Sequence, residues 1–166
     1  PLEAAPHALA YDPLRGRLYV GLMGHGEIVA LDAATLEAQG EPVSLGGLGL
    51  PQALALDAAT GRLAVAHSLS PKYGAVSLLS VEPLALQRTR WGNLEETLGG
   101  AAQAAFGPAA GEVTLRVAGR ALLLDAETLA TRREVALGGA GPLAADPLSR
   151  TLYLAAPDGG VWSWRE

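Results

Sequence analysis

The sequence contains no cysteine, which excludes disulfide bonds, thiol catalysis and haem attached through cysteine side chains. It has no run of about eighteen apolar residues, so we expect no membrane-spanning helix. It has no run of basic residues, and a formal net charge of -5 argues against a nucleic-acid-binding surface. An initiating methionine and a signal peptide are also missing, and we expect residues upstream of Pro1 to have been removed.

The sequence contains four copies of one motif. Each copy runs from a short apolar segment, through a turn, into a second apolar segment. The turn residues are spaced 45, 50 and 39 residues apart, and they are Asp12, Asp57, Gly107 and Asp146. Repeats of about 40 to 50 residues, each forming a small antiparallel sheet, are typical of β-propellers. Because 166 residues suit a single domain, we predict one all-β propeller region over residues 1–166.

Each repeat is expected to contain four antiparallel strands, A to D. In the first copy these strands are 8–11, 18–21, 27–31 and 42–45. In the A–B turn, Asp12 bonds its own backbone and Gly16 tolerates a left-handed conformation. The C–D turn of the first copy, 32–36, returns at 125–129 and more loosely at 80–84. Gly and Pro recur too often for long helices, so we expect little helix.

Strand B of each repeat resembles the Tyr-Val-x-Asn phrase of the YVTN-type propeller repeat. The four copies are Leu18-Tyr19-Val20-Gly21, Leu63-Ala64-Val65-Ala66, Val113-Thr114-Leu115-Arg116 and Leu152-Tyr153-Leu154-Ala155. The Asp-x-x-x-Gly-Arg turn before strand B and the Leu-Asp-Ala-x-Thr-Leu turn after strand C also match that repeat. The Asn is missing from every copy, so no role of that residue is carried over. The resemblance implies a surface-layer protein, a binding scaffold, a lactonase-like enzyme or a dehydrogenase subunit.

The blade count does not close a ring. The repeats fall at about 6–50, 51–100, 101–139 and 140–166, and the last lacks its strand D. The residues before the first repeat are few and include a proline, which cannot donate to a sheet ladder. We therefore expect these four blades to belong to a larger propeller of about six to eight blades. The alternatives are a four-bladed ring and a homodimer that completes one ring; an open-arc monomer is expected to be unstable.

Three histidines fall where a propeller has its upper loops. His7 opens strand A of the first repeat, His25 lies in its B–C loop, and His67 follows strand B of the second repeat. Imidazole is the commonest ligand of zinc and copper, so adjacent blades could assemble a metal site from them. Their spacings of 18 and 42 residues match no metal motif. We therefore interpret them as separate loop histidines and predict no metal and no cofactor.

Two segments break the repeat length, 67–74 and 90–97. Insertions in a regular array map to loops, and loops carry binding residues. Together with His7 and His25 of the first repeat, residues of these segments are the candidate ligand-binding residues: His67, Ser68, Tyr73, Arg90 and Trp91. Trp91 with Arg90 could form a recognition patch, and the alternative is that Trp91 covers a blade junction.

Other conspicuous residues have structural explanations. Trp162 and Trp164 are two residues apart, so they face one side of their strand, where packing between blades explains them. The recurring Asp residues are explained as turn caps. The paired arginines Arg88, Arg90, Arg132 and Arg133 are interpreted as solvated strand or loop positions. The sequence contains no nucleophile elbow, zinc-protease motif or phosphate-binding loop.

These observations predict a non-catalytic binding or scaffold module. From the resemblance alone we expect a secreted, periplasmic or cell-surface protein whose partner is another protein or further blades of the same propeller. The alternatives are a lactonase-like hydrolase that uses the upper-face residues and a subunit that docks to a redox partner.

Overall fold

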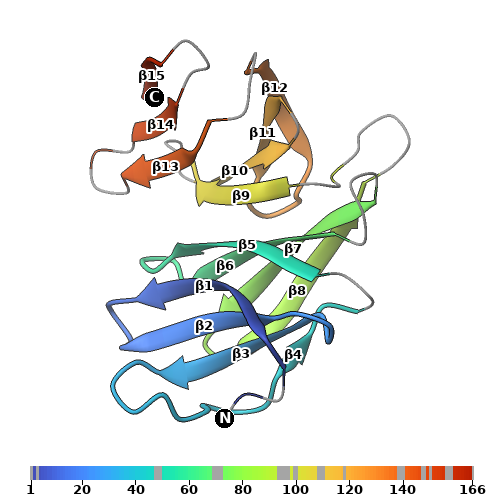
Figure 1. Ribbon diagram of the computed structural model, residues 1–166, viewed down its shortest axis with the longest axis vertical. Helices are drawn as coiled ribbons and strands as arrows, with labels where there is room; N and C mark the ends of the chain where they lie inside the picture. The colour runs from blue at the N-terminus through green and yellow to red at the C-terminus, as the bar shows by residue number, and fades with distance from the viewer. Residues whose placement is uncertain are drawn as a thin grey trace.

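Every regular element in the part of the chain that the computed structural model describes is a β-strand, and the strands form four antiparallel sheets, or blades (Figure 1). The described residues are 2, 4–46, 50–68, 73–92, 98, 101–107, 111–117, 119–137, 141–146, 149, 151–155 and 159–165. Blade 1 contains β1 (Pro6–Asp12), β2 (Arg17–Leu22), β3 (Glu27–Asp32) and β4 (Val43–Ser44). Blade 2 contains β5 (Leu50–Asp57), β6 (Arg62–Ser68), β7 (Gly74–Val81) and β8 (Leu84–Trp91). Blade 3 contains β9 (Ala101–Phe106), β10 (Glu112–Val117), β11 (Arg120–Asp125) and β12 (Thr131–Ala136), and blade 4 contains β13 (Leu143–Asp146), β14 (Thr151–Ala155) and β15 (Val161–Arg165).

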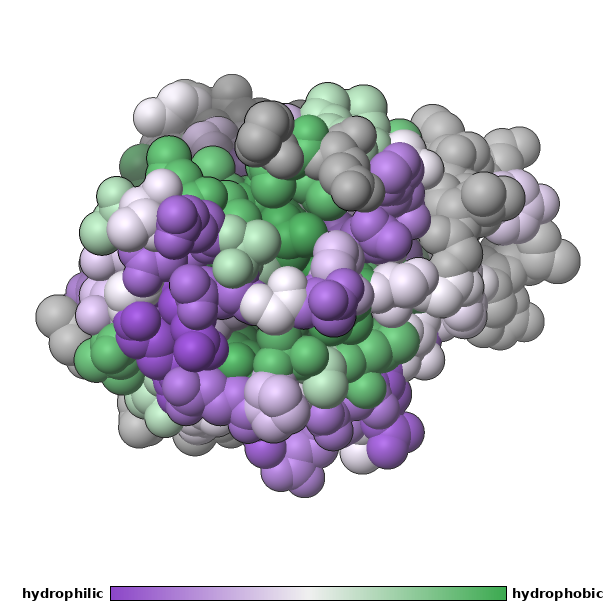
Figure 2. All heavy atoms as spheres, turned by 90° about the horizontal axis from the view of Figure 1, so that it is seen from below, coloured by the Kyte–Doolittle hydropathy of each residue, from purple (hydrophilic) through white to green (hydrophobic). Residues whose placement is uncertain are grey.

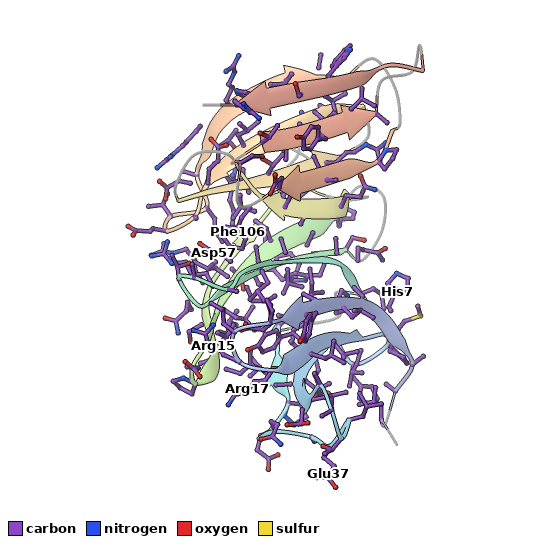
Figure 3. The ribbon with its side chains drawn as sticks, turned by 90° about the vertical axis from the view of Figure 1, so that its left-hand side faces the viewer. His7, Arg15, Arg17, Glu37, Asp57 and Phe106 are labelled. Atoms are coloured by element: carbon purple, nitrogen blue, oxygen red, sulfur yellow. The ribbon has the colours of Figure 1, made fainter. Side chains whose placement is uncertain are left out.

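The four blades are stacked face to face along an arc. Strand A of each blade contacts strand A of the next, so β1, β5, β9 and β13 form one continuous inner edge (Figure 3). The later strands of each blade extend away from that edge in chain order. This arrangement confirms the predicted all-β propeller architecture with about four blades.

Most strands are longer than the sequence predicted, and the difference moves several candidate residues. The exception is β4, which covers Val43–Ser44 where 42–45 was expected. Strand β8 continues past Arg88 to Trp91, because its ladder with β7 continues to the pair formed by Ala75 and Trp91. Strand β6 likewise includes His67 and Ser68. These residues therefore lie on strand ends rather than in loops. The predicted loop segments 69–72 and 93–97 lie outside the described residues.

The recurring aspartates cap turns, as predicted. In the A–B turns, Asp12 Oδ1 accepts hydrogen bonds from the amides of Leu14 and Arg15, and Asp57 does the same in blade 2. The C–D turns use Asp32 and Asp125 in the same way. The amide donors hold the pKa of both Asp32 and Asp125 below the usual range, because they stabilise the ionised carboxylate.

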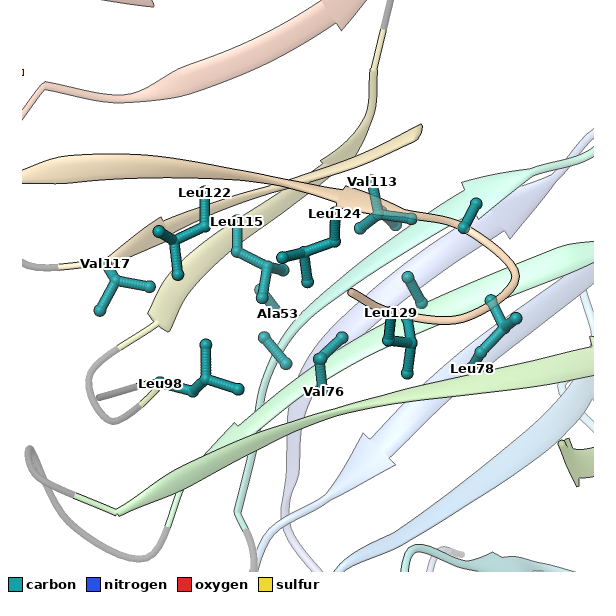
Figure 4. Packing of buried hydrophobic residues seen from close by; sticks show 14 residues of the cluster. Ala53, Val76, Leu78, Leu98, Val113, Leu115, Val117, Leu122, Leu124 and Leu129 are labelled. Atoms are coloured by element: carbon teal, nitrogen blue, oxygen red, sulfur yellow. The ribbon is translucent and has the colours of Figure 1, made fainter. Parts of the chain in front are cut away.

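Most of the core lies between the blades, and a smaller cluster of Val20, Leu22, Val29 and Leu31 lies on the face of blade 1 that points away from blade 2. Figure 4 shows the cluster between blades 2 and 3, where Val113, Leu115 and Leu124 point from blade 3 toward Val76 and Leu78 of blade 2. Equivalent clusters join blade 1 to blade 2 and blade 3 to blade 4. A sheet buried on both faces has apolar residues at successive positions, which is the pattern of β6 and β7.

One glycine sets the distance between blades 1 and 2. A Cβ atom added at Gly21 of β2 would lie 2.5 Å from Cβ of Pro51 and 3.4 Å from Cδ1 of Leu54, both in β5. The backbone of β2 therefore approaches the next blade closely only because position 21 has no side chain.

We call the end of the blades that carries the A–B turns the lower end, and the opposite end, where each strand A begins, the upper end. At the lower end, the arginine of the Gly-Arg turn in each of the first two blades contacts the next blade. The Arg17 guanidinium lies 3.9 Å from the Glu82 carboxylate, and Arg62 lies 3.2 Å from Glu127. Both pairs join residues 65 positions apart, so the contact repeats with the sequence. Exposed ion pairs of this kind are worth about 1 kcal/mol or less, so the apolar interfaces dominate the stability.

We expect the substitution Gly21→Ala to destabilise the protein by about 1–3 kcal/mol, because the added methyl group overpacks the interface against Pro51. Urea denaturation followed by circular dichroism measures the loss. The control is Ser44→Thr, which adds one methyl group to an exposed strand residue. Equal denaturation midpoints for Gly21→Ala and the wild-type chain would show that the interface relaxes freely.

Candidate functional site

The upper end of blade 2 brings together the candidate residues of the second repeat. His67 lies at the end of β6, beside Ser68, and Trp91 lies at the end of β8. Tyr73 directly precedes β7, the strand that runs between β6 and β8. The same end of the molecule carries His7 of blade 1, on the right in Figure 3.

His67 begins a chain of buried hydrogen bonds across three strands. Its Nε2 atom lies 2.9 Å from Oγ of Ser77 in β7, and that Oγ lies 2.8 Å from Oγ1 of Thr89 in β8. His67 is 1% exposed and Ser77 is fully buried. His67 stands 45 residues after Leu22, the spacing of the first two turn aspartates, so the two residues are equivalent in the repeat. Leu22 packs in the apolar cluster on the outer face of blade 1, whereas its equivalent in blade 2 is a polar ring.

The imidazole is held neutral by its surroundings. Burial lowers the pKa of His67 to about 4, because the charged form is poorly solvated between two blades. Its Nδ1 atom is buried and has no hydrogen-bond partner among the described residues. The ring is therefore fixed on one side by Ser77 and by packing on the other.

The indole of Trp91 rests against this histidine. The two rings meet edge to face, with centroids 5.7 Å apart. Trp91 remains 47% exposed, and Tyr73 is 59% exposed. The hydrogen-bonded side chains of His67, Ser77 and Thr89 thus support Trp91, whose outer surface faces solvent.

Arg90 does not belong to the same patch. Consecutive strand residues point to opposite faces of a sheet, and Arg90 faces blade 3 while Trp91 faces blade 1. Its Nη1 atom donates to the Leu129 carbonyl at 2.7 Å and to Oγ1 of Thr131 at 2.8 Å. Arg90 therefore joins two blades, which corrects its interpretation as a solvated residue. Two more of the paired arginines also have partners, since Arg132 pairs with Asp125 and Arg133 lies 4.6 Å from the ring of Trp164.

A second polar group lies at the upper end of the inner edge. His7 and Gln52 occupy equivalent irregularities in the β1–β2 and β5–β6 registers, and such bulges redirect side chains. His7 Nε2 lies 3.4 Å from Oε1 of Gln52 in the next blade. Farther along the arc, Gln103 accepts a hydrogen bond from the Leu143 amide at 2.6 Å. These contacts connect neighbouring inner strands by side chains.

The three histidines occupy separate settings. His7 contacts Gln52, His67 is buried, and His25 Nδ1 lies 3.5 Å from the Glu27 carboxylate. Over the described ranges, no group of three or more His, Cys, Asp or Glu side chains is arranged to hold a metal ion. These same ranges contain no helix long and apolar enough to cross a membrane.

Sequence reasoning missed Ser77, Thr89 and Gln52. A signal for Ser77 exists, because it interrupts the apolar run of β7 and so marks a polar partner within a buried strand. The signal for Gln52 is its position 45 residues after His7. Thr89 has no comparable signal, since Thr is common on strands.

The Ser77 hydroxyl that contacts the His67 imidazole is fully buried, so a substrate could not reach it without opening the interface. An exposed tryptophan held in one orientation loses little conformational entropy when a ligand covers it.

We expect acidification from pH 6.5 to pH 4 to destabilise the protein through His67. In this window the unfolded chain binds a proton at His67 and the folded chain does not, so the free energy of unfolding falls by up to about 3 kcal/mol. Urea denaturation at several pH values should show that the free energy of unfolding of His67→Leu depends less steeply on pH than that of the wild-type chain. An unaltered dependence in His67→Leu would contradict this role.

No protein-family model matches the chain, and no curated protein matches it either. Solved structures do share its fold. A chain of hydrazine synthase from Kuenenia stuttgartiensis aligns with a TM-score of 0.72 and 16% identity over 91% of this chain and 42% of that one. Sqt1 from Saccharomyces cerevisiae aligns with a TM-score of 0.70 and 12% identity over 99% of this chain and 47% of that one. The chain therefore has a β-propeller fold and spans less than half the length of these two proteins.

Proposed function

We propose that this chain is a non-catalytic binding module whose upper face recognises a protein or peptide through blade 2. The observation that carries the proposal is the pairing of an exposed indole, Trp91, with the buried imidazole of His67. Tryptophan and tyrosine are enriched among the residues that dominate binding energy at interfaces. Tyr73, next to β7, enlarges the aromatic surface.

The hydrogen-bond chain supports this proposal because an apolar side chain would stabilise the interface between the blades equally well. The polar side chains therefore indicate a role other than stability. At the equivalent position of blade 1, Leu22 fills the site. A buried histidine bonded through Ser77 and Thr89 fixes both the ring and the end of β8, and so holds Trp91 in place. Preorganisation of this kind favours affinity by reducing the entropy lost on binding.

We also propose that both ends of the arc join further propeller blades. On the outer face of blade 1, Leu9 is 66% exposed and Tyr11 is 55% exposed. Their equivalents one repeat later, Leu54 and Leu56, pack against the cluster between blades 1 and 2. Figure 2, which looks onto blade 1 from below, shows hydrophobic atoms across the middle of this face with hydrophilic atoms around them. The chemistry of the face therefore matches that of a blade interface.

Blade 4, at the other end of the arc, also has a face that no described blade covers. Tyr19 is fully buried between blades 1 and 2, whereas its repeat equivalent in blade 4, Tyr153, is 36% exposed. Blade 4 also has three described strands where the others have four. A second copy of the chain is the alternative source of the covering blades.

The extracytoplasmic location and membership of the YVTN-type group belong to the same proposal and rest on the repeat resemblance. A lactonase-like hydrolase has less support, because His67 is buried and neutral while His7 and His25 lie in separate settings. No observation favours docking to a redox partner over docking to another protein.

Selection of peptides from a displayed library tests the binding proposal. We expect the enriched peptides to bind the Trp91→Ala variant about tenfold or more weakly than the wild-type chain. The matched control is Trp162→Ala, since Trp162 is also 47% exposed but lies on blade 4. Peptides that bind Trp91→Ala as well as wild type, or a selection that enriches none, would contradict the proposal.

Light scattering over a range of protein concentrations tests the proposal that both ends of the arc join further blades. We expect the isolated chain to self-associate and Leu9→Lys to shift association to roughly tenfold higher concentration, because a charge on the open face disfavours its burial. The control is Leu14→Lys, at a turn residue that is 70% exposed. A wild-type chain that stays monomeric throughout would show that the end faces need no cover.

A further inference from the structure

A groove of about 350 Å³ lies at the lower end of blade 2, on the side that faces blade 3. It is at the same end of the molecule as Arg15, Arg17 and Asp57 in Figure 3. The groove is lined by the A–B turn, by β7 and β8, and by the C–D turn of blade 3; the lining includes Thr60, Arg62, Leu78, Gln87, Arg88 and Glu127. It lies on the face of blade 2 toward blade 3, whereas His67 and Trp91 lie on the face toward blade 1, so the inference drawn from it does not depend on the proposed function.

Two guanidinium groups reach this groove from the same face of blade 2. Arg62 pairs across the ladder with Ser80 of β7, and Leu78, two residues earlier, pairs with Arg88 of β8. Residues two apart on a strand share a face, so Arg62 and Arg88 both point toward blade 3. Their strands are separated by β7, which places the two strands about 10 Å apart.

The hydrogen-bond donors in the groove exceed the acceptors. Arg62 makes one contact, 3.2 Å from its Nη2 atom to the Glu127 carboxylate. Arg88 makes no hydrogen bond or ion pair with any residue that the structure describes. Gln87 donates to Oγ of Ser80 at 3.0 Å. Glu127 supplies the single carboxylate of the lining, so the guanidinium of Arg88 remains unmatched.

The equivalent region between blades 1 and 2 is bridged by arginine side chains. There Glu82 contacts two arginines, Arg15 at 3.0 Å and Arg17 at 3.9 Å, and Arg15 also donates to the Ala58 carbonyl at 2.8 Å. One repeat later, Thr60 stands where Arg15 would be, so the turn no longer sends a long side chain across the interface. The space remains open, and Arg88 adds a cation to it.

The shape of the groove favours a side chain of an extended segment over a compact anion. The lining groups are side chains on three strands and two turns, whereas phosphate sites usually gather several backbone amides around one point. Leu78, which is 6% exposed, provides an apolar contact beside the guanidinium groups. Guanidinium groups bind carboxylates through two parallel hydrogen bonds, which suits glutamate or aspartate.

We propose that this groove binds an acidic peptide segment of a partner protein, with a carboxylate on Arg88 and an adjacent apolar residue over Leu78. The chain carries a net charge of -5, which disfavours nonspecific attraction of acidic peptides. Binding of such a peptide would therefore reflect the local charge of the groove and not the net charge of the protein.

Titration calorimetry with an acetylated and amidated peptide that alternates glutamate and leucine tests the proposal. We expect weak, salt-sensitive binding that falls at least tenfold in Arg88→Gln. The control Arg120→Gln removes the same charge from an arginine of blade 3 that already pairs with Glu134, and it should bind as wild type does. Both substitutions are at strand surfaces, and circular dichroism confirms that each variant is folded.

Two further probes separate the alternatives. The same peptide with glutamine in place of glutamate should not bind, and inorganic phosphate should not displace the acidic peptide at equal concentration. Equal binding of the glutamine peptide, equal binding by Arg88→Gln, or binding of phosphate in preference to the peptide would each overturn the proposal. The Trp91→Ala variant should bind the acidic peptide normally, so failure here is distinguishable from failure of the upper-face proposal.

Discussion

The two interior blades of this protein, blades 2 and 3, bury both faces of their sheets by packing against their neighbours. The consequence is visible in equivalent residues, since Tyr19 is fully buried between two blades and Tyr153 is one-third exposed at the end of the arc. Burial of a large side chain contributes roughly 1.5–3 kcal/mol, so the stability of a blade depends on the presence of the next one. In repeat proteins of this kind, stability approximates a sum of terms within repeats and between neighbours.

The same constraint explains where polar residues can be placed. Sheets that pack this closely need a residue without a side chain where β2 meets Pro51, and position 21 is glycine. Burying a polar ring in such an interface costs less when it is hydrogen-bonded; Ser77 is the partner of His67 Nε2, and Thr89 in turn bonds Ser77. The two proposed binding surfaces lie on opposite faces of blade 2, because Trp91 of β8 faces blade 1 and Arg88 of the same strand faces blade 3.

Much of the fold follows from residues that repeat. The turn aspartates, including Asp12 and Asp125, and the apolar strands predicted four sheets, because turn chemistry and strand alternation are local properties. Packing between blades was predicted for both Trp162 and Trp164, and it is confirmed for Trp164. It is wrong for Trp162, which is 47% exposed.

The site was less predictable, because it depends on departures from the repeat and on contacts between strands. His67 was identified as a candidate, but its burial depends on the position of β6 within the interface, which a loop interpretation did not anticipate. Arg90 and Trp91 are adjacent in sequence and were interpreted together, yet the extension of β8 directs them to different blades. The groove around Arg88 could not be inferred, because it depends on the short side chain of Thr60 in another turn.

Native-state hydrogen exchange tests most directly the claim that neighbouring blades stabilise one another. The account predicts the slowest exchange in β6, β7, β10 and β11, which lie in sheets covered on both faces, and the fastest in β14 and β15, which lie at the open end. Exchange in β14 and β15 as slow as in β6 and β7 would show that each blade is stable alone, and would contradict the account.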